Sequence, residues 1–513
     1  MTTPDKNNQQ MPKFPEPYWR SSVQLPSFPV LQEDIAADVA IVGGGISGIT
    51  TAYLLVKEGV KVVLIDAGEI LNGTTGHTTA KITAQHGLIY NELINHFGVE
   101  KAKLYYEANN DALQWIKQTI NNHQIDCDFQ EDDAYIYTND TNYFQQLNDE
   151  MKAYEKLGID SEFVTSIPID VQMKAAIKMK NQAQFHPLKY LQVLVDYIVD
   201  HGGQIFEHTT AIDVDENEKM HVITRNGKKI KCDYVLACSH FPFYDGLGFY
   251  PTRLYAERSY IIAAKTEKKF PGGMYINAEK PTRSLRNAMI NDEQVVLFAG
   301  ENHKTGQGIS TIRHYEALEQ FAKQTLGMKA FLYRWSAQDL TTLDKIPYIG
   351  EITTGKPRIL IATGYRKWGM SNGTAAARLL SDMILKRENR YVDLYTPKRF
   401  STDPSVKTFL KENIDVAKHL IEGKLEYPLR TTDELSNDEG AVVQVNGKRA
   451  GAYKDEHGKL YIVDTTCTHL GCEVEWNSGD RTWDCPCHGS RYSIVGDIID
   501  GPAEKPLQRI EEK

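Results

Sequence analysis

Four cysteines and two histidines lie close together near the end of the chain, in the segments CTHLGC and DCPCHGS. Cys467 and His469 form a Cys-x-His pair, and Cys485 and His488 form a Cys-x-x-His pair. Thiolates and imidazoles are the side chains that bind zinc and iron–sulfur clusters in proteins. The spacing therefore predicts a metal centre held by two neighbouring loops.

Three kinds of site compete for these residues. Structural zinc sites usually pair their ligands as C-x2-4-C and H-x3-5-H, a pattern that the two mixed pairs do not follow. A nucleophilic cysteine or a general-base histidine would need a partner pattern that the segments lack. A [2Fe-2S] cluster bound by two thiolates and two neutral imidazoles is less negative than a four-thiolate cluster, so it accepts an electron at a higher potential. The sequence favours this cluster, with zinc as the alternative.

The two segments resemble the metal-binding segments of Rieske proteins. The resemblance implies that Cys467 and Cys485 bind one iron of a [2Fe-2S] cluster. It implies that His469 and His488 bind the other iron. We therefore expect one cluster, which carries one electron at a time.

The same resemblance assigns four further residues and a covering loop. It implies a disulfide between Cys472 and Cys487, as in the Rieske proteins of cytochrome bc complexes. It implies that the hydroxyls of Ser490 and Tyr492 hydrogen-bond to the cluster, which would raise its potential. The segment GPAEKPL, residues 501–507, resembles the proline loop that covers the cluster.

A glycine-rich turn near the N-terminus forms a second motif. Residues 38–68, DVAIVGGGISGITTAYLLVKEGVKVVLIDAG, predict a strand, a tight turn, a helix and a strand. Gly43, Gly45 and Gly48 fit the G-x-G-x-x-G dinucleotide motif in that context. Asp66 ends the second strand, where a carboxylate accepts hydrogen bonds from the ribose hydroxyls. Because an acidic side chain there disfavours a 2′-phosphate, the sequence predicts FAD or NAD and not NADP. The residues beside these that we also expect at the nucleotide are Ile46, Ser47 and Ala67.

Residues from about 30 to 390 resemble the D-amino-acid oxidase family of flavoproteins, which includes enzymes that oxidise glycine, sarcosine and dimethylglycine. The segments EILNGTTGHTTAKITAQHG and IATGYRKWGMSNGTAAARLLSDMI carry the resemblance. It implies that the cofactor is FAD. The residues that it places near the pyrophosphate or the flavin ring are Thr74, Thr75, Thr79, Gly364, Gly369, Met370 and Ser371.

His77 has two possible roles beside the flavin. The segment GTTGHTTAK resembles GTTWHAAG of dimethylglycine and sarcosine dehydrogenases, in which the histidine carries FAD covalently. Here Gly76 replaces the tryptophan, and Thr78 and Thr79 replace the two alanines. The sequence favours a hydrogen-bonding histidine in the flavin loop, with covalent attachment as the alternative.

The resemblance implies hydride transfer to the flavin from a carbon that bears nitrogen. In such a site the protein orients the substrate and tunes the cofactor. An arginine often binds a substrate carboxylate with two hydrogen bonds. The candidate catalytic residues are Arg258, Tyr260, Arg286 and Lys367, and Arg283, Tyr365 and Arg366 are further candidates.

The chain has 513 residues, too many for one hydrophobic core. We predict an α/β FAD-binding Rossmann-like domain with an α+β substrate domain over residues 38–390, and an all-β Rieske domain over residues 428–513. An N-terminal arm, expected to be extended on the surface, precedes them, and a linker joins them. The predicted bounds are 1–37 for the arm, about 38–90, 165–250 and 336–390 for the FAD-binding parts, about 91–164 and 251–335 for the substrate parts, and 391–427 for the linker.

Composition limits the partners. The net charge is −10 and no basic run stands out, which disfavours nucleic acid and anionic membrane surfaces. The polar N-terminal segment lacks an apolar stretch, and no apolar run approaches about 18 residues, so we expect a cytoplasmic protein without a transmembrane segment. The scattered Cys127, Cys232 and Cys238 are expected to be buried apolar residues.

These motifs together predict a dehydrogenase. FAD would take two electrons from a small amine or amino acid, and the cluster would pass them singly to an external acceptor, a protein or a quinone. Two alternatives remain. One is a reductase that feeds an oxygenase, although only one dinucleotide motif is present, and the other is a non-enzymatic redox sensor. A membrane quinol-oxidising subunit is less favoured, because the Rieske segment follows a flavoprotein.

Overall fold

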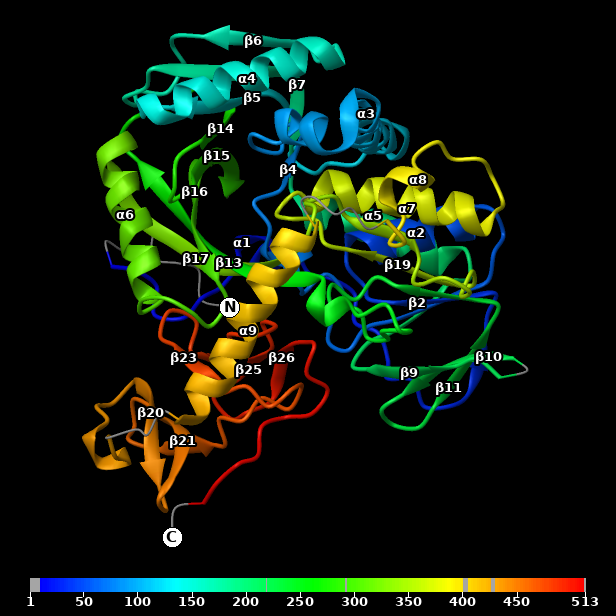
Figure 1. Cartoon of the computed structure of the whole chain (residues 1–513), viewed down its shortest axis with the longest axis vertical. Helices are drawn as coiled ribbons and strands as arrows, with labels where there is room; N and C mark the ends of the chain where they lie inside the picture. The colour runs from blue at the N-terminus through cyan, green and yellow to red at the C-terminus, as the bar shows by residue number, and fades with distance from the viewer. Residues whose placement is uncertain (1–9, 218, 291–292, 400–404, 426–429, 512–513) are drawn as a thin grey trace.

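The computed structural model describes residues 10–217, 219–290, 293–399, 405–425 and 430–511. Parts of the predicted arm, linker and Rieske domain lie outside these residues. Figure 1 shows a large N-terminal body with a smaller C-terminal module at its lower end. No helix among the described residues is long and apolar enough to cross a membrane.

A six-stranded sheet with the order β18-β19-β12-β2-β3-β8 lies at the centre of the N-terminal body. Strands β2, β3 and β19 are fully buried apolar segments, which suits a sheet covered on both faces. Helices α2, α5 and α7 contribute to the core on one face, and a small sheet of β1, β11, β10 and β9 covers the other. This arrangement confirms the predicted α/β fold. The bounds are β1 Ile35–Ala36, β2 Val39–Val42, α2 Ile46–Lys57, β3 Val62–Ile65, α5 Pro187–Asp200, β8 Gln204–Phe206, β9 Ala211–Asp215, β10 Met220–Thr224, β11 Lys229–Cys232, β12 Tyr234–Ala237, β18 Tyr348–Glu351, β19 Ile359–Thr363 and α7 Gly369–Ile384.

A nine-stranded sheet forms the second part of this body, with β17 and β13 paired at one edge. Side chains alternate between its two faces along each strand. Helix α6 covers one face of β13 and β17. The other face belongs to the core shared with the six-stranded sheet. The bounds are β4 Lys81–Ile82, α3 Tyr90–His123, β5 Gln130–Thr138, α4 Thr141–Leu157, β6 Ser161–Val164, β7 Ala175–Gln184, β13 Leu254–Thr266, β14 Met274–Asn277, β15 Arg283–Ile290, β16 Glu293–Lys304, α6 Ile312–Leu326 and β17 Met328–Thr342.

The C-terminal module consists of two small antiparallel sheets, β20-β21-β22 and β23-β24-β25-β26. This confirms the predicted all-β class. The two cysteine–histidine segments are the loops that follow β22 and β24. The bounds are β20 Glu439–Val445, β21 Lys448–Lys454, β22 Leu460–Val463, β23 Glu475–Asn477, β24 Thr482–Asp484, β25 Arg491–Tyr492 and β26 Ile498–Asp500.

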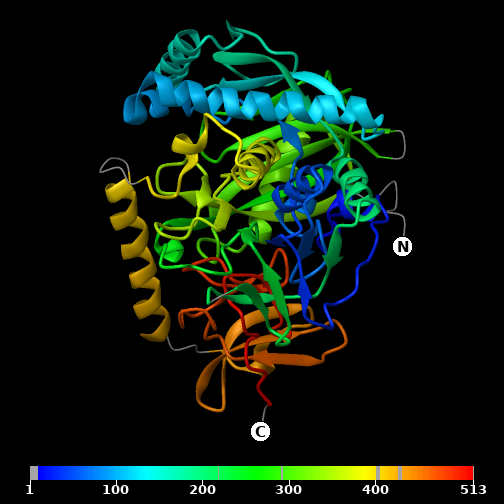
Figure 2. The ribbon, with the colours of Figure 1, turned by 90° about the vertical axis from the view of Figure 1, so that its right-hand side faces the viewer.

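Two segments connect the module to the N-terminal body. Helix α9, Lys407–Leu425, runs along the outside of both parts (Figure 2). The N-terminal arm is less superficial than its composition suggested, because Trp19 is only 1% exposed. Arg334 donates hydrogen bonds to carbonyl oxygens of the arm, at Pro12 and Lys13, and of the module, at Gly479. The arm therefore helps to fix the module in place.

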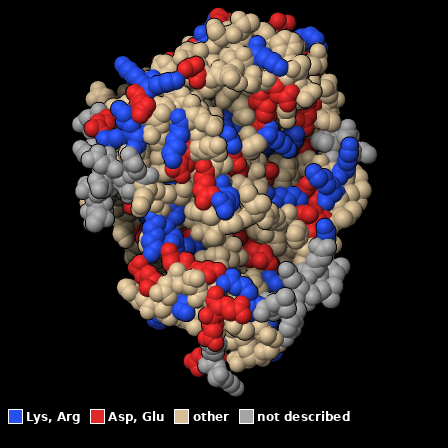
Figure 3. All heavy atoms as spheres, turned by 90° about the vertical axis from the view of Figure 1, so that its left-hand side faces the viewer, with Lys and Arg blue, Asp and Glu red and all other residues tan. Residues whose placement is uncertain are grey.

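Acidic and basic side chains intermingle on the face that carries α6 and the C-terminal module (Figure 3). The short elements that complete the described chain are α1 Tyr18–Ser21, η1 Thr74–His77, η2 Tyr250–Thr252, α8 Val392–Tyr395 and η4 Thr432–Glu434.

Candidate functional site

The turn between β2 and α2 accepts only glycine at two positions. Gly43 has a φ of +111°, and a Cβ atom there would lie 2.4 Å from the carbonyl oxygen of Cys238. A Cβ atom at Gly48 would lie 1.9 Å from the carbonyl oxygen of Gly43. Close packing of strand, turn and helix thus fixes the start of α2, and a helix N-terminus favours a negatively charged pyrophosphate.

The side chains of Asp66 and Thr75 accept hydrogen bonds from the backbone of the turn and of the start of α2. The Asp66 carboxylate accepts hydrogen bonds from the backbone N–H of Gly44, at 2.7 Å, and of Gly68, at 2.8 Å. Burial raises the pKa of Asp66. The Thr75 hydroxyl accepts from the N–H of Ile46 at 3.0 Å. Ala67 follows Asp66 and is exposed.

The loop around η1 rests on β17. The Thr74 hydroxyl donates to the carbonyl oxygen of Gln338 at 2.9 Å, and the Trp335 indole donates to the carbonyl oxygen of His77 at 2.8 Å. The His77 Nδ1 atom lies 2.9 Å from the carbonyl oxygen of Gly73. Because a carbonyl can only accept, Nδ1 carries the proton of this hydrogen bond.

A third segment, between β19 and α7, meets the turn. Gly364 has a φ of +81°, which reverses the chain after β19. The Tyr365 and Ser47 hydroxyls are 2.6 Å apart. Gly369 begins α7, Met370 is 3% exposed, and the Ser371 hydroxyl lies 3.1 Å from Nε2 of His86. The three segments that resemblance assigned to FAD therefore lie side by side.

Polar side chains that are neither fully buried nor fully exposed lie in and beside these segments. The side chains are Asp66, His77, Lys81, His240, Asp339 and Tyr365. The buried Nε2 atom of His240 has no hydrogen-bond partner in the described chain. A set of polar side chains with an unpaired polar atom suits a polar cofactor such as FAD.

Arg258 and Tyr260 lie on the same face of β13, opposite to the face of Glu257. Tyr260 is fully buried, stacks on His314 at 4.9 Å and lies within hydrogen-bond distance of His303. Arg258 is 1% exposed and donates to the Ser336 hydroxyl at 2.7 Å and to the side-chain oxygen of Gln338 at 3.1 Å. The structure therefore places these two candidates against α6 and the C-terminal module.

Arg286 and Arg283 are engaged by the protein itself. Arg286 donates to the carbonyl oxygens of Thr79 and Ala80, at 3.0 and 2.8 Å. These hydrogen bonds stabilise the flavin loop, the segment that contains η1 and the residues just after it. Burial lowers the pKa of Arg286 to about 9. Arg283 pairs with Glu301 at 2.6 Å.

Lys367 is the candidate that contacts two acids of the nine-stranded sheet. Its ammonium is 3.3 Å from the Glu257 carboxylate, and its backbone N–H donates to Asp339 at 3.2 Å. Glu257 and Asp339 are a cross-strand pair between β13 and β17. Burial raises the pKa of Asp339 to about 6. Sequence patterns missed both acids, because only the pairing of the two strands brings them together.

The four expected cluster ligands meet between the two loops of the C-terminal module. The rings of His469 and His488 are 4.9 Å apart and perpendicular, and neither Nδ1 atom has a hydrogen-bond partner in the described chain. Burial lowers the pKa of each imidazole to about 4, which keeps it neutral. A hydrogen bond from Cys485 lowers the pKa of Cys467 to about 6. Two thiols and two free imidazole nitrogens suit a Rieske cluster.

The residues around the ligands also meet expectation in part. Cys472 and Cys487 form a disulfide, with an S–S distance of 2.01 Å, which confirms the predicted bond. Cys485 lies near both sulfurs, but the disulfide removes them as ligands. The Tyr492 hydroxyl lies 3.2 Å from the Cys467 sulfur, and the Ser490 hydroxyl accepts from the N–H of Ala503 at 3.0 Å.

The cluster loops pack directly on the N-terminal body. The Gln338 side chain donates to the carbonyl oxygen of Gly489 at 2.9 Å, next to His488. The ring of Phe241 lies 6.2 Å from the ring of His469. Because Gln338 also accepts from Thr74, one residue touches both the flavin loop and a cluster loop.

A buried charge cluster completes this contact. Arg258 lies 3.7, 3.6 and 3.9 Å from Asp480, Asp484 and Asp500 of the C-terminal module. Arg491 of the module pairs with the same three acids, at 2.9, 3.2 and 3.3 Å. The acids of the module therefore surround a buried cation of the N-terminal body.

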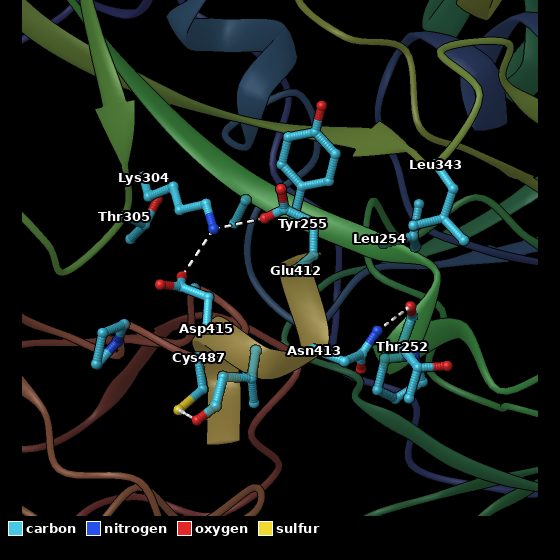
Figure 4. Close-up of a pocket in the computed structure, with 15 residues that line it drawn as sticks. Thr252, Leu254, Tyr255, Lys304, Thr305, Leu343, Glu412, Asn413, Asp415 and Cys487 are labelled. Atoms are coloured by element: carbon cyan, nitrogen blue, oxygen red, sulfur yellow. Dashed lines mark hydrogen bonds and ion pairs between the residues drawn. The ribbon is translucent and has the colours of Figure 1, made fainter. Parts of the chain in front are cut away.

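A cleft lies beside the disulfide, between α9, the start of β13 and the second cluster loop (Figure 4). Lys304 bridges Glu412 and Asp415 across it, at 2.5 and 2.7 Å. The cleft has a volume of about 20 Å³, which accommodates roughly one water. The cleft is thus too small to receive a substrate.

Comparisons with known proteins agree with both sites. The family model "FAD dependent oxidoreductase" matches residues 38–383, and the model "Rieske [2Fe-2S] domain" matches residues 426–511. YhfW of Bacillus subtilis (strain 168), whose name assigns it as a Rieske 2Fe-2S iron-sulfur protein, is 52% identical over 97% of this chain and 98% of its own length.

More distant relatives match the N-terminal body. Gamma-glutamylputrescine oxidoreductase of Escherichia coli (strain K12) is 21% identical over 73% of this chain and 89% of its own length. The crystal structure of glycine oxidase from Geobacillus kaustophilus has a TM-score of 0.60 at 15% identity, over 71% of this chain and 99% of its own. This chain therefore belongs to the FAD-dependent oxidoreductase family, and it carries a C-terminal Rieske [2Fe-2S] domain.

Proposed function

We propose that this protein is a dehydrogenase that oxidises a small amine or amino acid at a carbon that bears nitrogen. Its electrons would pass through FAD and the Rieske cluster to an external one-electron acceptor, a protein or a quinone. When bound, FAD accepts a hydride and releases electrons singly, which matches a two-electron donor to a one-electron cluster. The names of the two distant relatives, gamma-glutamylputrescine oxidoreductase and glycine oxidase, support the substrate class.

The observation that carries the proposal is the contact between the two cofactor loops. Gln338 accepts from Thr74 of the flavin loop and donates to Gly489 of the cluster loop. The cluster ligand His469 faces Phe241, which follows His240. This packing favours direct electron transfer within one chain, and it needs no swing of the Rieske domain.

The charged groups beside the flavin fit a substrate that carries both charges. Lys367 can orient a carboxylate, and Glu257 and Asp339 can bind an ammonium group. Arg258 is unsuited to this role because it faces the acids of the Rieske domain. Lys367 is therefore our proposed substrate-orienting residue.

The test is anaerobic mixing of the purified protein with a pool of N-methylated amines, diamines and amino acids. The proposal expects the electron paramagnetic resonance signal of the reduced Rieske cluster, at the intensity that dithionite produces. Dividing the pool then identifies the substrate. A signal with dithionite but with no pool member would contradict the proposed substrate class.

A further inference from the structure

The N-terminal arm contacts the flavin loop at one end and is anchored at the other. The carbonyl oxygen of Lys13 accepts hydrogen bonds from Arg334 of β17, at 2.6 Å, and from Arg481 of the Rieske domain. Further along the arm, the Trp19 indole donates to the carbonyl oxygen of Thr78, the residue that follows η1, at 2.7 Å. Because Lys13 is held in place, the arm can act as a fixed support for the loop.

Trp19 contacts a second polar group as well as this carbonyl. The tryptophan is 1% exposed, and the Arg286 guanidinium lies over its ring, 5.4 Å from the ring centre. The face of an indole ring attracts a cation, and it does so more strongly where water is excluded. The His186 ring packs edge-on against the same indole, at 4.9 Å. Trp19 therefore orients the Arg286 side chain as well as the Thr78 carbonyl.

Arg286 extends this contact along the flavin loop. Its guanidinium donates to the carbonyl oxygens of Thr79 and Ala80, at 3.0 and 2.8 Å. Hydrogen bonds from a charged donor are stronger than those between neutral groups. Trp19 and Arg286 together therefore hold the carbonyl groups of three successive residues, 78 to 80.

Ala80 has a backbone conformation that needs such support. Its φ is +56°, in the left-handed region that residues with a Cβ atom rarely adopt, and the residue is fully buried. Strained backbone persists only where the surrounding structure imposes it, and it is concentrated at functional sites. The hydrogen bonds to residues 78 to 80 thus stabilise a bend that the sequence of the loop does not itself favour.

The next residue of the arm packs on the other end of the flavin loop. A Cβ atom at Gly76 of η1 would lie 3.3 Å from the Cδ atom of Arg20 and 2.4 Å from the carbonyl oxygen of Leu71. The Arg20 guanidinium donates to the carbonyl oxygen of Ile70 at 3.3 Å and pairs with Glu69. Two successive residues of the arm therefore contact the loop on both sides of η1.

We propose that Trp19 is a positioning residue for the flavin. Acting through the Thr78 carbonyl and through Arg286, it holds the flavin loop in the conformation that lies against FAD. This inference rests on the placement of FAD in the proposed function. A tryptophan that only filled the core would need apolar contacts alone, whereas the N–H group and the ring face of Trp19 both reach polar groups that define the loop.

The first readout is hydrogen–deuterium exchange at the flavin loop in the full-length holoprotein. Trp19→Phe keeps an aromatic ring beside Arg286 but removes the indole N–H, and Trp19→Leu removes both. Exchange in the loop should be about fivefold faster in Trp19→Phe, the factor that one hydrogen bond contributes, and faster still in Trp19→Leu. Exchange in the Rieske domain should not change.

The second readout is the visible circular dichroism of the bound flavin, which depends on the groups around the isoalloxazine ring. The measurement applies equally to free and to covalently bound FAD. The signal should weaken in the same order, from native protein to Trp19→Phe to Trp19→Leu.

Tyr18→Phe is the matched control. Tyr18 is the neighbouring buried aromatic residue of the arm, and its hydroxyl donates to the carbonyl oxygen of Met289 on β15, at 2.6 Å, and not to the flavin loop. Both readouts should match those of the native protein.

Faster exchange throughout the chain, or an equal effect of Tyr18→Phe, would show that Trp19 only stabilises the fold and would overturn the inference. Faster exchange in the loop with an unchanged flavin signal would also overturn it, because the loop would then not lie against the flavin. The proposed function fails on a different result, namely native protein in which reduced flavin does not reduce the cluster.

Discussion

Gln338 donates a hydrogen bond of 2.9 Å to the carbonyl oxygen of Gly489, the residue that follows the proposed cluster ligand His488. The same glutamine accepts from Arg258 and Thr305 through its side-chain oxygen, and from Thr74 through its carbonyl oxygen. A single residue of β17 thus contacts the flavin loop and the cluster loop. The position of the Rieske domain follows from side chains that both sites share.

Replacing Arg258 with methionine should destabilise the interface between the domains. Asp480, Asp484 and Asp500 would keep only Arg491 as a buried cation. Removing one partner of a buried ion pair costs about 3–5 kcal/mol. Urea unfolding should show this loss, and electron transfer from flavin to cluster should slow.

Arg509→Ala is the control for that variant, because Arg509 forms an exposed ion pair with Asp497 on the same domain. Exposed pairs contribute little to stability. Equal unfolding curves for native protein and Arg258→Met would contradict the assigned role of the charge cluster.

Tyr492→Phe should lower the midpoint potential of the cluster. The hydroxyl lies 3.2 Å from the sulfur of Cys467, and a donor to a ligand thiolate stabilises the more negative reduced state. One hydrogen bond of about 1 kcal/mol corresponds to roughly 40 mV for a one-electron couple. A redox titration monitored by electron paramagnetic resonance measures the shift. Tyr461→Phe, away from the ligands, should leave the potential unchanged, and an equal shift there would refute the assignment.

Gly48→Ala should abolish FAD binding. The added Cβ atom would lie 1.9 Å from the carbonyl oxygen of Gly43, so the turn must open where the pyrophosphate is expected. The purified variant should contain little flavin by absorbance. The Rieske signal serves as an internal control and should persist after dithionite treatment. A full flavin content would show that FAD does not occupy this turn.

Asp339 should make stability fall as pH rises. Burial raises its pKa from 3.8 to about 6, so between these values the folded protein retains a proton that the unfolded chain releases. The stability that the protonated Asp339 carboxyl contributes is fully present below about pH 4. It is lost as pH rises through about 6, where the free energy of unfolding falls by roughly 2–3 kcal/mol. Asp339→Asn should lack this loss. The free energy of unfolding of the flavin-free native protein and of Asp339→Asn, measured at pH 4.5 and pH 7, checks this prediction. An equal change in that free energy between the two pH values for both proteins would contradict the raised pKa of Asp339.

The sites differ in how far sequence could predict them. The glycine turn and the four proposed cluster ligands lie on short segments, so the spacing of their residues was enough to predict their chemistry. Arg258 was a candidate for substrate binding, but it contacts three acids that lie more than 200 residues further along the chain. No local sequence pattern predicts such contacts. Gln338 and Asp500 belong to no motif for the same reason. Lys81 lies within the flavin loop segment, and its pKa of about 7, lowered by burial, became evident only from the fold.

The arm and α9 show the same limit. Prolines and polar residues suggested a superficial arm, yet Trp19 is buried and donates to the carbonyl oxygen of Thr78 in the flavin loop. The predicted linker contains α9, whose Asn413 donates to the carbonyl oxygen of Thr252. Tertiary contacts rather than local composition determine both segments.

The central claim is that flavin and cluster exchange electrons within one chain. The most direct measurement reduces the flavin by a light pulse, without oxygen or substrate, and follows the cluster absorbance at several protein concentrations. The account predicts first-order reduction of the cluster at a rate that does not depend on concentration. A cluster that stays oxidised beside reduced flavin, or a rate proportional to protein concentration, would contradict it.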